Sequence, residues 1–164
     1  MRFEESYNYD APVAKVWKML SAESFVKDRN ANLQIPDPAV NITATDKSIH
    51  TITSGEVPPS MIPAAAQRFL KSGASFVINE EWNLVNPTEI KGSFKAQGKG
   101  VPAHLLASIN LIQNASGTTD VTMHGEIKIN IPFLGAKLEK QALGFAPELV
   151  QADGKAATDW LAAN

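Results

Sequence analysis

The segment HGEIKINIPFLGAKLEKQALGF, which begins at His124, changes its hydrophobic period at Pro132. Before the proline every second residue is apolar, which is typical of a strand with one dry face. After it the apolar residues recur at intervals of three and four, which is typical of an amphipathic helix. The sequence therefore predicts a strand of an antiparallel sheet that leads directly into a helix lying on that sheet.

The predicted C-terminal helix carries one apolar stripe that includes several alanines. Its positions, at steps of three or four, are Leu134, Leu138, Ala142, Phe145, Leu149, Ala152, Ala156 and Trp160. Because alanine is too small to fill the gap between a helix and a sheet, we expect a hollow beneath the helix.

Pro147 lies inside this helix, where it removes the hydrogen bond to the carbonyl of Leu143 and crowds that turn. The cost is about 3 kcal/mol if the helix stays continuous, so the helix is predicted to kink or break. Gly144 lies just upstream, and two interpretations stay open. The bend is either a static one that follows the sheet or a hinge that opens an entrance beside the segment PSMIPAAAQRFL.

The N-terminal part of the chain predicts one strand and two short helices. Residues 2–9 alternate in the manner of a strand with an aromatic face. Asp10 or Ala11 is placed to cap a helix that has a proline in its first turn, and Ser21 to cap a second helix that runs to about Ala31.

The middle of the chain predicts a hairpin, a small inserted helix and four further strands. VNITA and IHTITS alternate on either side of a turn. PPSMIPAAAQRFLKSG follows, with Phe69 and Leu70 on an apolar helix face and Gly73 just after its end. The remaining strands are FVINEEWNLV, EIKGSFKAQ, VPAHLLASINLI and TTDVTMHGEIKINI, and Gly98-Lys99-Gly100 is interpreted as a hairpin turn.

Composition excludes several functional classes. A length of 164 residues with 44% hydrophobic content favours one globular domain. A formal net charge of −2 without a basic cluster argues against a nucleic-acid partner. The absence of cysteine excludes disulfides and thiolate metal sites. No apolar run is long enough for a signal peptide or a membrane span, so we expect a cytoplasmic protein.

The order of elements resembles the helix-grip superfamily, also called SRPBCC or START-like, which includes polyketide cyclases and the birch-pollen allergen. The resemblance is greatest to a bacterial, actinobacterial-type branch that forms a domain of unknown function. It rests on the segments APVAKVWKML, SFVKDR, RFLKSG, NEEWNL, IPFLGAKLEKQ and TDWL. It implies an α+β fold over residues 1–164, in which a curved antiparallel sheet of about seven strands wraps around the C-terminal helix, with two short helices after the first strand.

The resemblance also implies an apolar cavity between the sheet and the last helix. Strand parity and the helix stripe predict that its lining consists of Phe3, Tyr7, Tyr9, Ile78, Trp82, Phe94, Met123, Ile127, Leu138 and Phe145. Each of these side chains has an alternative interpretation as simple core packing, because buried apolar residues need no functional explanation.

Glu5 and Glu80 share strand parity with apolar residues and are candidates for catalysis or for a polar anchor in the cavity. The alternative is a β-bulge that turns either carboxylate outward. His104 and His124 lie on the opposite parity and are expected to face water, and the spacing of the histidines indicates no metal site.

Three classes of function remain open, in order of preference. The first is binding or transport of a small hydrophobic or amphipathic ligand of lipid, polyketide or aromatic type, without a cofactor. The second is a polyketide cyclase- or aromatase-like enzyme that uses the same cavity. The third is a protein-interaction module that uses the outer face of the sheet, which the pattern of Thr, Lys, Glu and Asn predicts to be solvated. Both a monomer and a homodimer are compatible with the sequence.

Overall fold

The computed structural model describes residues 1–70 and 73–164. The strands are β1 (Arg2–Tyr9), β2 (Ala39–Ala44), β3 (Ser48–Glu56), β4 (Ser75–Asn86), β5 (Glu89–Lys99), β6 (Ala103–Gln113) and β7 (Thr119–Ile129). The helices are α1 (Val13–Leu20), α2 (Glu23–Asn32), α3 (Ala64–Gln67), α4 (Gly135–Leu143) and α5 (Ala146–Ala163), with a short 3-10 turn, η1, at Pro59–Met61.

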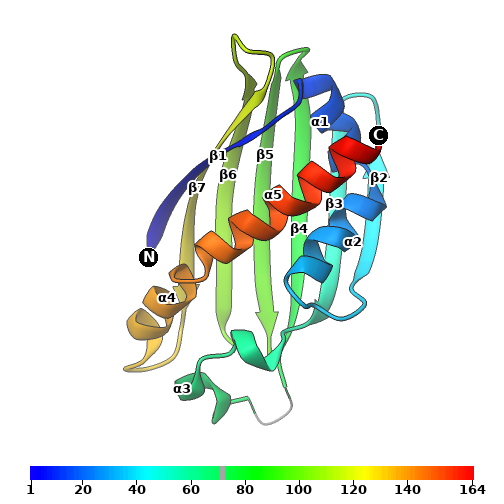
Figure 1. The fold of residues 1–164 in the computed structure, drawn as a ribbon. Coiled ribbons are helices and arrows are strands. Elements are labelled where there is room, and N and C mark those ends of the chain that lie inside the picture. Colours follow the sequence, from blue (N-terminus) through cyan, green and yellow to red (C-terminus); the bar gives the residue numbers. More distant parts are fainter. Residues whose placement is uncertain (71–72) are drawn as a thin grey trace.

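Within the described residues the strands form one seven-stranded antiparallel sheet in the order β1-β7-β6-β5-β4-β3-β2. Helix α5 crosses one face of this sheet diagonally, with α1 and α2 beside it (Figure 1). We call this the inner face. The hairpins β4–β5 and β6–β7 define one end of the sheet, the hairpin end, and α3 lies at the other, the α3 end (Figure 1). The predicted helix-grip arrangement is confirmed.

The two short helices form where predicted, but their caps differ. Pro12 is the N-cap of α1, and because its side chain cannot accept a hydrogen bond, Gln113 of β6 accepts one from the backbone N–H of Val13 at 3.0 Å. Ser21 does not cap α2, which begins after Ala22. Its hydroxyl instead donates to the carbonyl of Lys18 at 2.8 Å and closes α1.

The inserted helix is shorter than predicted. It consists of η1 and the four residues of α3, because the prolines around it limit each helical run and one turn alone is costly to nucleate. Phe69 lies beyond α3 and is half exposed, so it does not belong to an apolar helix face. Lys71 and Ser72, which the prediction included, lie outside the described residues.

The C-terminal helix breaks where Pro147 predicts. Helix α4 ends at Leu143, and α5 begins at Ala146 with Pro147 in its first turn, where a missing N–H costs nothing. Beyond the break most of the predicted stripe still faces inward, since Ala152 and Ala156 are buried. Leu149, in the first turn of α5, is 40% exposed, whereas Asp153 points inward and is buried.

The hydrophobic core lies at the hairpin end, between the sheet and helices α1, α2 and α5. Its most deeply buried side chains include Val13, Val16, Met19, Phe25, Ile49, Ile90, Leu111 and Val121. Toward the α3 end the same inner face is less covered, and its apolar side chains are only partly buried.

Candidate functional site

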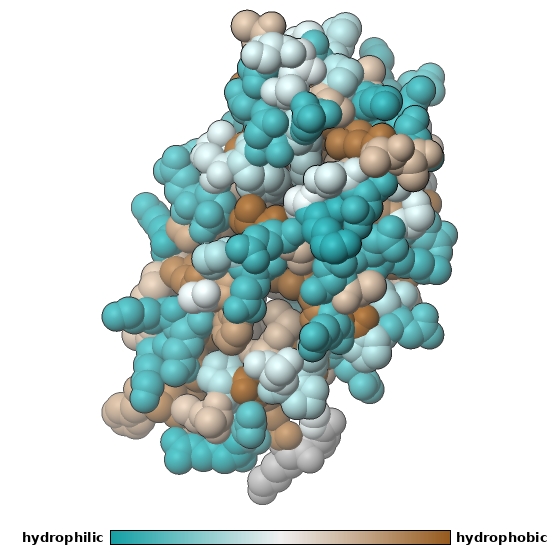
Figure 2. Space-filling model, viewed as in Figure 1, coloured by the Kyte–Doolittle hydropathy of each residue, from teal (hydrophilic) through white to brown (hydrophobic). Residues whose placement is uncertain are grey.

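The inner face of the sheet carries a continuous set of partly exposed apolar side chains toward the α3 end. They come from five strands, β1, β4, β5, β6 and β7. We call Phe3, Phe76, Ile78, Phe94, Ala96, Leu105, Met123 and Ile127 the inner apolar surface. Figure 2 shows apolar atoms that reach the surface below α5, between hydrophilic side chains. This surface stays available for contact with another molecule.

The predicted lining residues divide into two groups. Tyr9, Trp82 and Leu138 are 4%, 6% and 2% exposed, and the first two belong to the core. The partly exposed group consists of Phe3, Tyr7, Ile78, Phe94, Met123, Ile127 and Phe145. The residues of the first group are therefore buried by packing, whereas those of the second group stay partly accessible, and Tyr7, Phe94 and Met123 among them also pack against the core.

Beneath the middle of α5, where the sequence predicted a hollow, the structure contains a cluster of polar side chains. Arg29 of α2 donates two hydrogen bonds to Glu80 of β4, at 3.0 and 2.7 Å, and a third to Asp153 of α5 at 3.4 Å. The hydroxyl of Tyr9 in β1 donates to the other Asp153 oxygen at 2.5 Å. This buried ion cluster links four separate elements under the crossing helix.

The charges in the buried ion cluster do not balance, because two carboxylates share one guanidinium. Burial raises the pKa of Asp153 above its ordinary value of 3.8, although Arg29 and Tyr9 both act in the opposite direction. Burial by itself would lower the pKa of Arg29, but the attraction of Glu80 and Asp153 raises it, so the guanidinium stays charged. Burial also raises the pKa of the Tyr9 phenol.

Tyr7 connects the buried ion cluster to the inner apolar surface. Its ring packs edge-on against Tyr9 with the ring centroids 5.5 Å apart, and its side chain is partly exposed. Burial and the negative charge of Asp153 raise the pKa of Tyr7 well above its usual range, so the phenol keeps its proton. A neutral hydroxyl therefore lies at the polar border of the apolar surface.

Glu80 points inward and is 2% exposed, so the alternative of a bulge that turns it outward is wrong. The irregularity in the pairing of β4 with β5 lies between Leu84 and Asn86 instead. Both oxygens of Glu80 accept hydrogen bonds from Arg29, which leaves the carboxylate poorly placed to take a proton from a substrate. Glu5 is only partly buried and lies opposite Met123.

Sequence reasoning missed Arg29 and Asp153. Arg29 follows Phe25 by four residues in a helix, so it shares the helix face that packs on the core, and this spacing was a usable signal. Asp153 precedes Ala156 of the predicted stripe by three residues, so its position on the inward side of α5 was a usable signal as well.

The raised pKa of Asp153 predicts an unusual pH dependence. As pH rises above about 4, the folded state holds a proton that the unfolded state has released, so this group's contribution to stability falls. Asp153→Asn mimics the protonated form and keeps an acceptor for Tyr9. We expect the variant to gain stability relative to the wild type as pH rises from about 4 to 8, measured by urea unfolding at each pH. A relative loss would mean that Arg29 outweighs burial.

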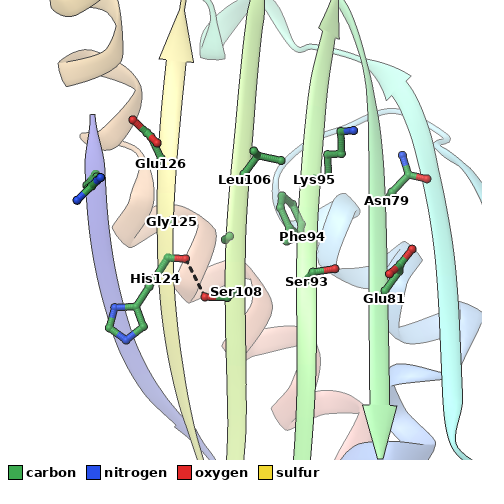
Figure 3. Close-up of a pocket in the computed structure, with 12 residues that line it drawn as sticks. Asn79, Glu81, Ser93, Phe94, Lys95, Leu106, Ser108, His124, Gly125 and Glu126 are labelled. Carbon is green, nitrogen blue, oxygen red and sulfur yellow. Dashed lines mark hydrogen bonds between the residues drawn. The ribbon is translucent and has the colours of Figure 1, made fainter.

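The outer face of the sheet carries a separate concavity of about 620 Å³. Figure 3 shows it from the side opposite α5, with Asn79, Glu81, Ser93, Lys95 and Leu106 among the residues that line it. The outer face is less polar than predicted, because Leu106 is 56% exposed and Ile112 is 50% exposed. His104 and His124 lie on this face and are exposed, as predicted.

The fold and comparisons with known proteins place the chain in a class. The architecture is that of START-like helix-grip proteins. A conserved protein from Geobacillus kaustophilus has a TM-score of 0.62 at 12% identity, covering 99% of this chain and 96% of that one. A START superfamily protein from Mycobacterium smegmatis has a TM-score of 0.53 at 11% identity, covering 97% of this chain and 98% of that one. Norcoclaurine synthase from Thalictrum flavum has a TM-score of 0.56 at 14% identity, covering 100% of this chain and 87% of that one.

Within this class the chain belongs to the family described as "Protein of unknown function (DUF2505)", whose model matches residues 4–161. A search among curated proteins finds no match to the sequence. Among the described residues, no helix has both the length and the apolar character that crossing a membrane requires.

Proposed function

We propose that this protein binds a small hydrophobic or amphipathic ligand on the inner apolar surface, between the sheet and the helices α4 and α5. The main supporting observation is that seven of the ten lining residues predicted from the sequence remain partly exposed, six of them on the inner face of the sheet and Phe145 at the start of α5. When a ligand covers apolar side chains that folding has left accessible to water, the free energy falls, and this favours binding. The class of ligand is lipid, polyketide or aromatic.

The polar border of the surface supports an amphipathic ligand. Tyr7 offers a neutral hydroxyl, and the Arg29 side chain keeps 16% of its surface exposed. A few fixed polar groups beside a large apolar area are the usual composition of small-molecule sites. The ligand would place its apolar part on the strands and its polar group toward α2.

Catalysis has weaker support. One structural relative is named as a synthase, so the fold is compatible with an enzyme. In this chain, however, both oxygens of Glu80 accept hydrogen bonds from Arg29. Of the two carboxylates proposed from the sequence as catalytic, this leaves Glu5. Binding without turnover therefore fits the arrangement of side chains better.

A pair of variants tests the site. Ala96 faces the inner apolar surface, and its neighbour Lys95 lines the outer concavity. Tryptophan at position 96 would cover part of the surface, so Ala96→Trp should weaken binding of the dye anilinonaphthalene sulfonate at least about tenfold, which corresponds to about 1.4 kcal/mol. Lys95→Trp, the matched control, should leave the dye affinity unchanged.

Fluorescence titration measures the affinity, and thermal unfolding confirms that both variants are folded. If Lys95→Trp weakens binding and Ala96→Trp does not, the ligand belongs to the outer concavity and the proposal fails. Native mass spectrometry of freshly purified protein, followed by extraction, would identify a ligand that purifies with the chain.

A further inference from the structure

Phe133, in the turn between β7 and α4, is fully exposed, with a relative accessibility of 104%. Its backbone has a φ of 63°, in the left-handed region that side chains with a Cβ rarely adopt. Glycine or asparagine would fit this turn better, and a polar side chain would fit the exposure better. Because Phe133 contributes so little to folding, its side chain is available for a contact outside the molecule.

The residues around Phe133 are basic. The segment 128–140 contains Lys128, Lys137 and Lys140, and its single acidic residue is Glu139. Glu139 is buried and accepts a hydrogen bond from the backbone N–H of Ile129 at 2.9 Å, so its charge is directed inward. The lysines are all exposed. The outside of this segment is therefore cationic around an exposed phenyl ring.

The turn that carries Phe133 lies at the same end of the sheet as a second exposed phenylalanine. The turn after β7 and the region of α3 both lie at the α3 end of the sheet (Figure 1). Close to α3, Phe69 is 50% exposed and Arg68 lies over its ring at 5.0 Å. The α3 end thus presents two exposed phenylalanines, each with basic residues nearby, beside the inner apolar surface.

We infer that the α3 end docks on an anionic lipid surface, with Phe133 inserted among the lipids and Lys137 and Lys140 against the head groups. An aromatic side chain beside lysines matches both the apolar interior and the negative surface of such a membrane. A second copy of this chain fits less well, since a symmetric dimer through the same patch would bring lysines against their own copies. This inference does not depend on the proposed ligand site.

Vesicle co-sedimentation tests the inference. Wild-type protein should sediment with vesicles made of equal parts of phosphatidylglycerol and phosphatidylcholine, and much less with phosphatidylcholine alone. Phe133→Asn keeps a residue that tolerates the left-handed backbone and should weaken binding about tenfold. Lys137→Glu should weaken it by about fivefold or more on the anionic vesicles.

Matched controls come from the outer face of the sheet. Leu106→Asn removes another exposed apolar side chain, which is 56% exposed, and Lys91→Glu reverses an exposed lysine charge in β5. Both should leave sedimentation unchanged. Raising the salt to about 1 M, where the screening length is about 3 Å, should release most of the wild-type protein.

Because the chain has no cysteine, a single introduced one can carry a polarity-sensitive dye. The dye on Ala136→Cys should shift to the blue when anionic vesicles are added, whereas the dye on Ala115→Cys, in the β6–β7 turn at the hairpin end, should not. Equal sedimentation of wild type and Phe133→Asn would overturn the inference. So would a dimer in solution that Phe133→Asn dissociates, because Phe133 would then contact a second copy.

Discussion

Replacing Arg29 with methionine is expected to lower the free energy of unfolding by about 3–5 kcal/mol. The side chain donates two hydrogen bonds to Glu80 and one to Asp153. Methionine keeps a similar volume but leaves Glu80, which is 2% exposed, as an uncompensated buried charge. Urea unfolding measures the change.

The expected effect is large because the pair is buried. Ion pairs on the helix surfaces, such as Lys155–Asp159, have exposed partners whose attraction water screens, so each contributes little to stability. Arg68→Met, which replaces an exposed arginine, is the control and should change stability by less than about 0.5 kcal/mol. Arg29→Met combined with Glu80→Leu should recover much of the loss, since removal of both charges leaves no unpaired carboxylate on β4.

A loss of under about 1 kcal/mol for Arg29→Met would contradict this account. It would indicate that water reaches Glu80 and solvates the carboxylate. The inner apolar surface would then extend further under α5 than the packing indicates. The same measurement therefore reports how deep the proposed ligand site is.

The fold could be predicted because its signals are local and periodic. The change of period at Pro132 predicted a strand that leads into a helix, and β7 and α4 confirm it. Pro147 predicted a break because a missing N–H and a ring clash act within one turn. The cap of α1 could not be predicted in this way, since its acceptor, Gln113, lies 100 residues further along the chain.

The site was harder to predict because it depends on how elements cross. Parity on a single strand gave an inward position for Glu80 as one of two open interpretations, and the buried position in the structure decides for it. Its partner Arg29 comes from a helix whose orientation depends on tertiary packing, and Asp153 reaches Arg29 because α5 packs beside α2 as it crosses the sheet. The space that alanines were expected to leave under α5 is occupied by these longer polar side chains.

Trp82→Ala is expected to lower the free energy of unfolding by about 3–5 kcal/mol. Trp82 is 6% exposed, belongs to the core and lies directly opposite Gly92 of β5. A Cβ added at Gly92 would lie 2.3 Å from the indole ring, so the ring occupies the space where a side chain would be. Gly92→Ala alone should therefore cost about 1–3 kcal/mol through overpacking.

The two changes should compensate each other when they are combined. Once Trp82 is alanine, the Cβ at position 92 meets no ring, and only the contact with the Glu81 carbonyl oxygen at 3.2 Å remains. The cost of Gly92→Ala should therefore fall, with a coupling of about 1–3 kcal/mol in a double-mutant cycle. Gly154→Ala, in α5 with no atom within 4 Å of its added Cβ, is the control and should stabilise by about 1 kcal/mol. If Trp82→Ala is too unstable to measure, Trp82→Leu serves in the same cycle. Simple additivity at positions 82 and 92 would mean that the ring does not lie over the glycine, and that the core at the hairpin end is packed differently.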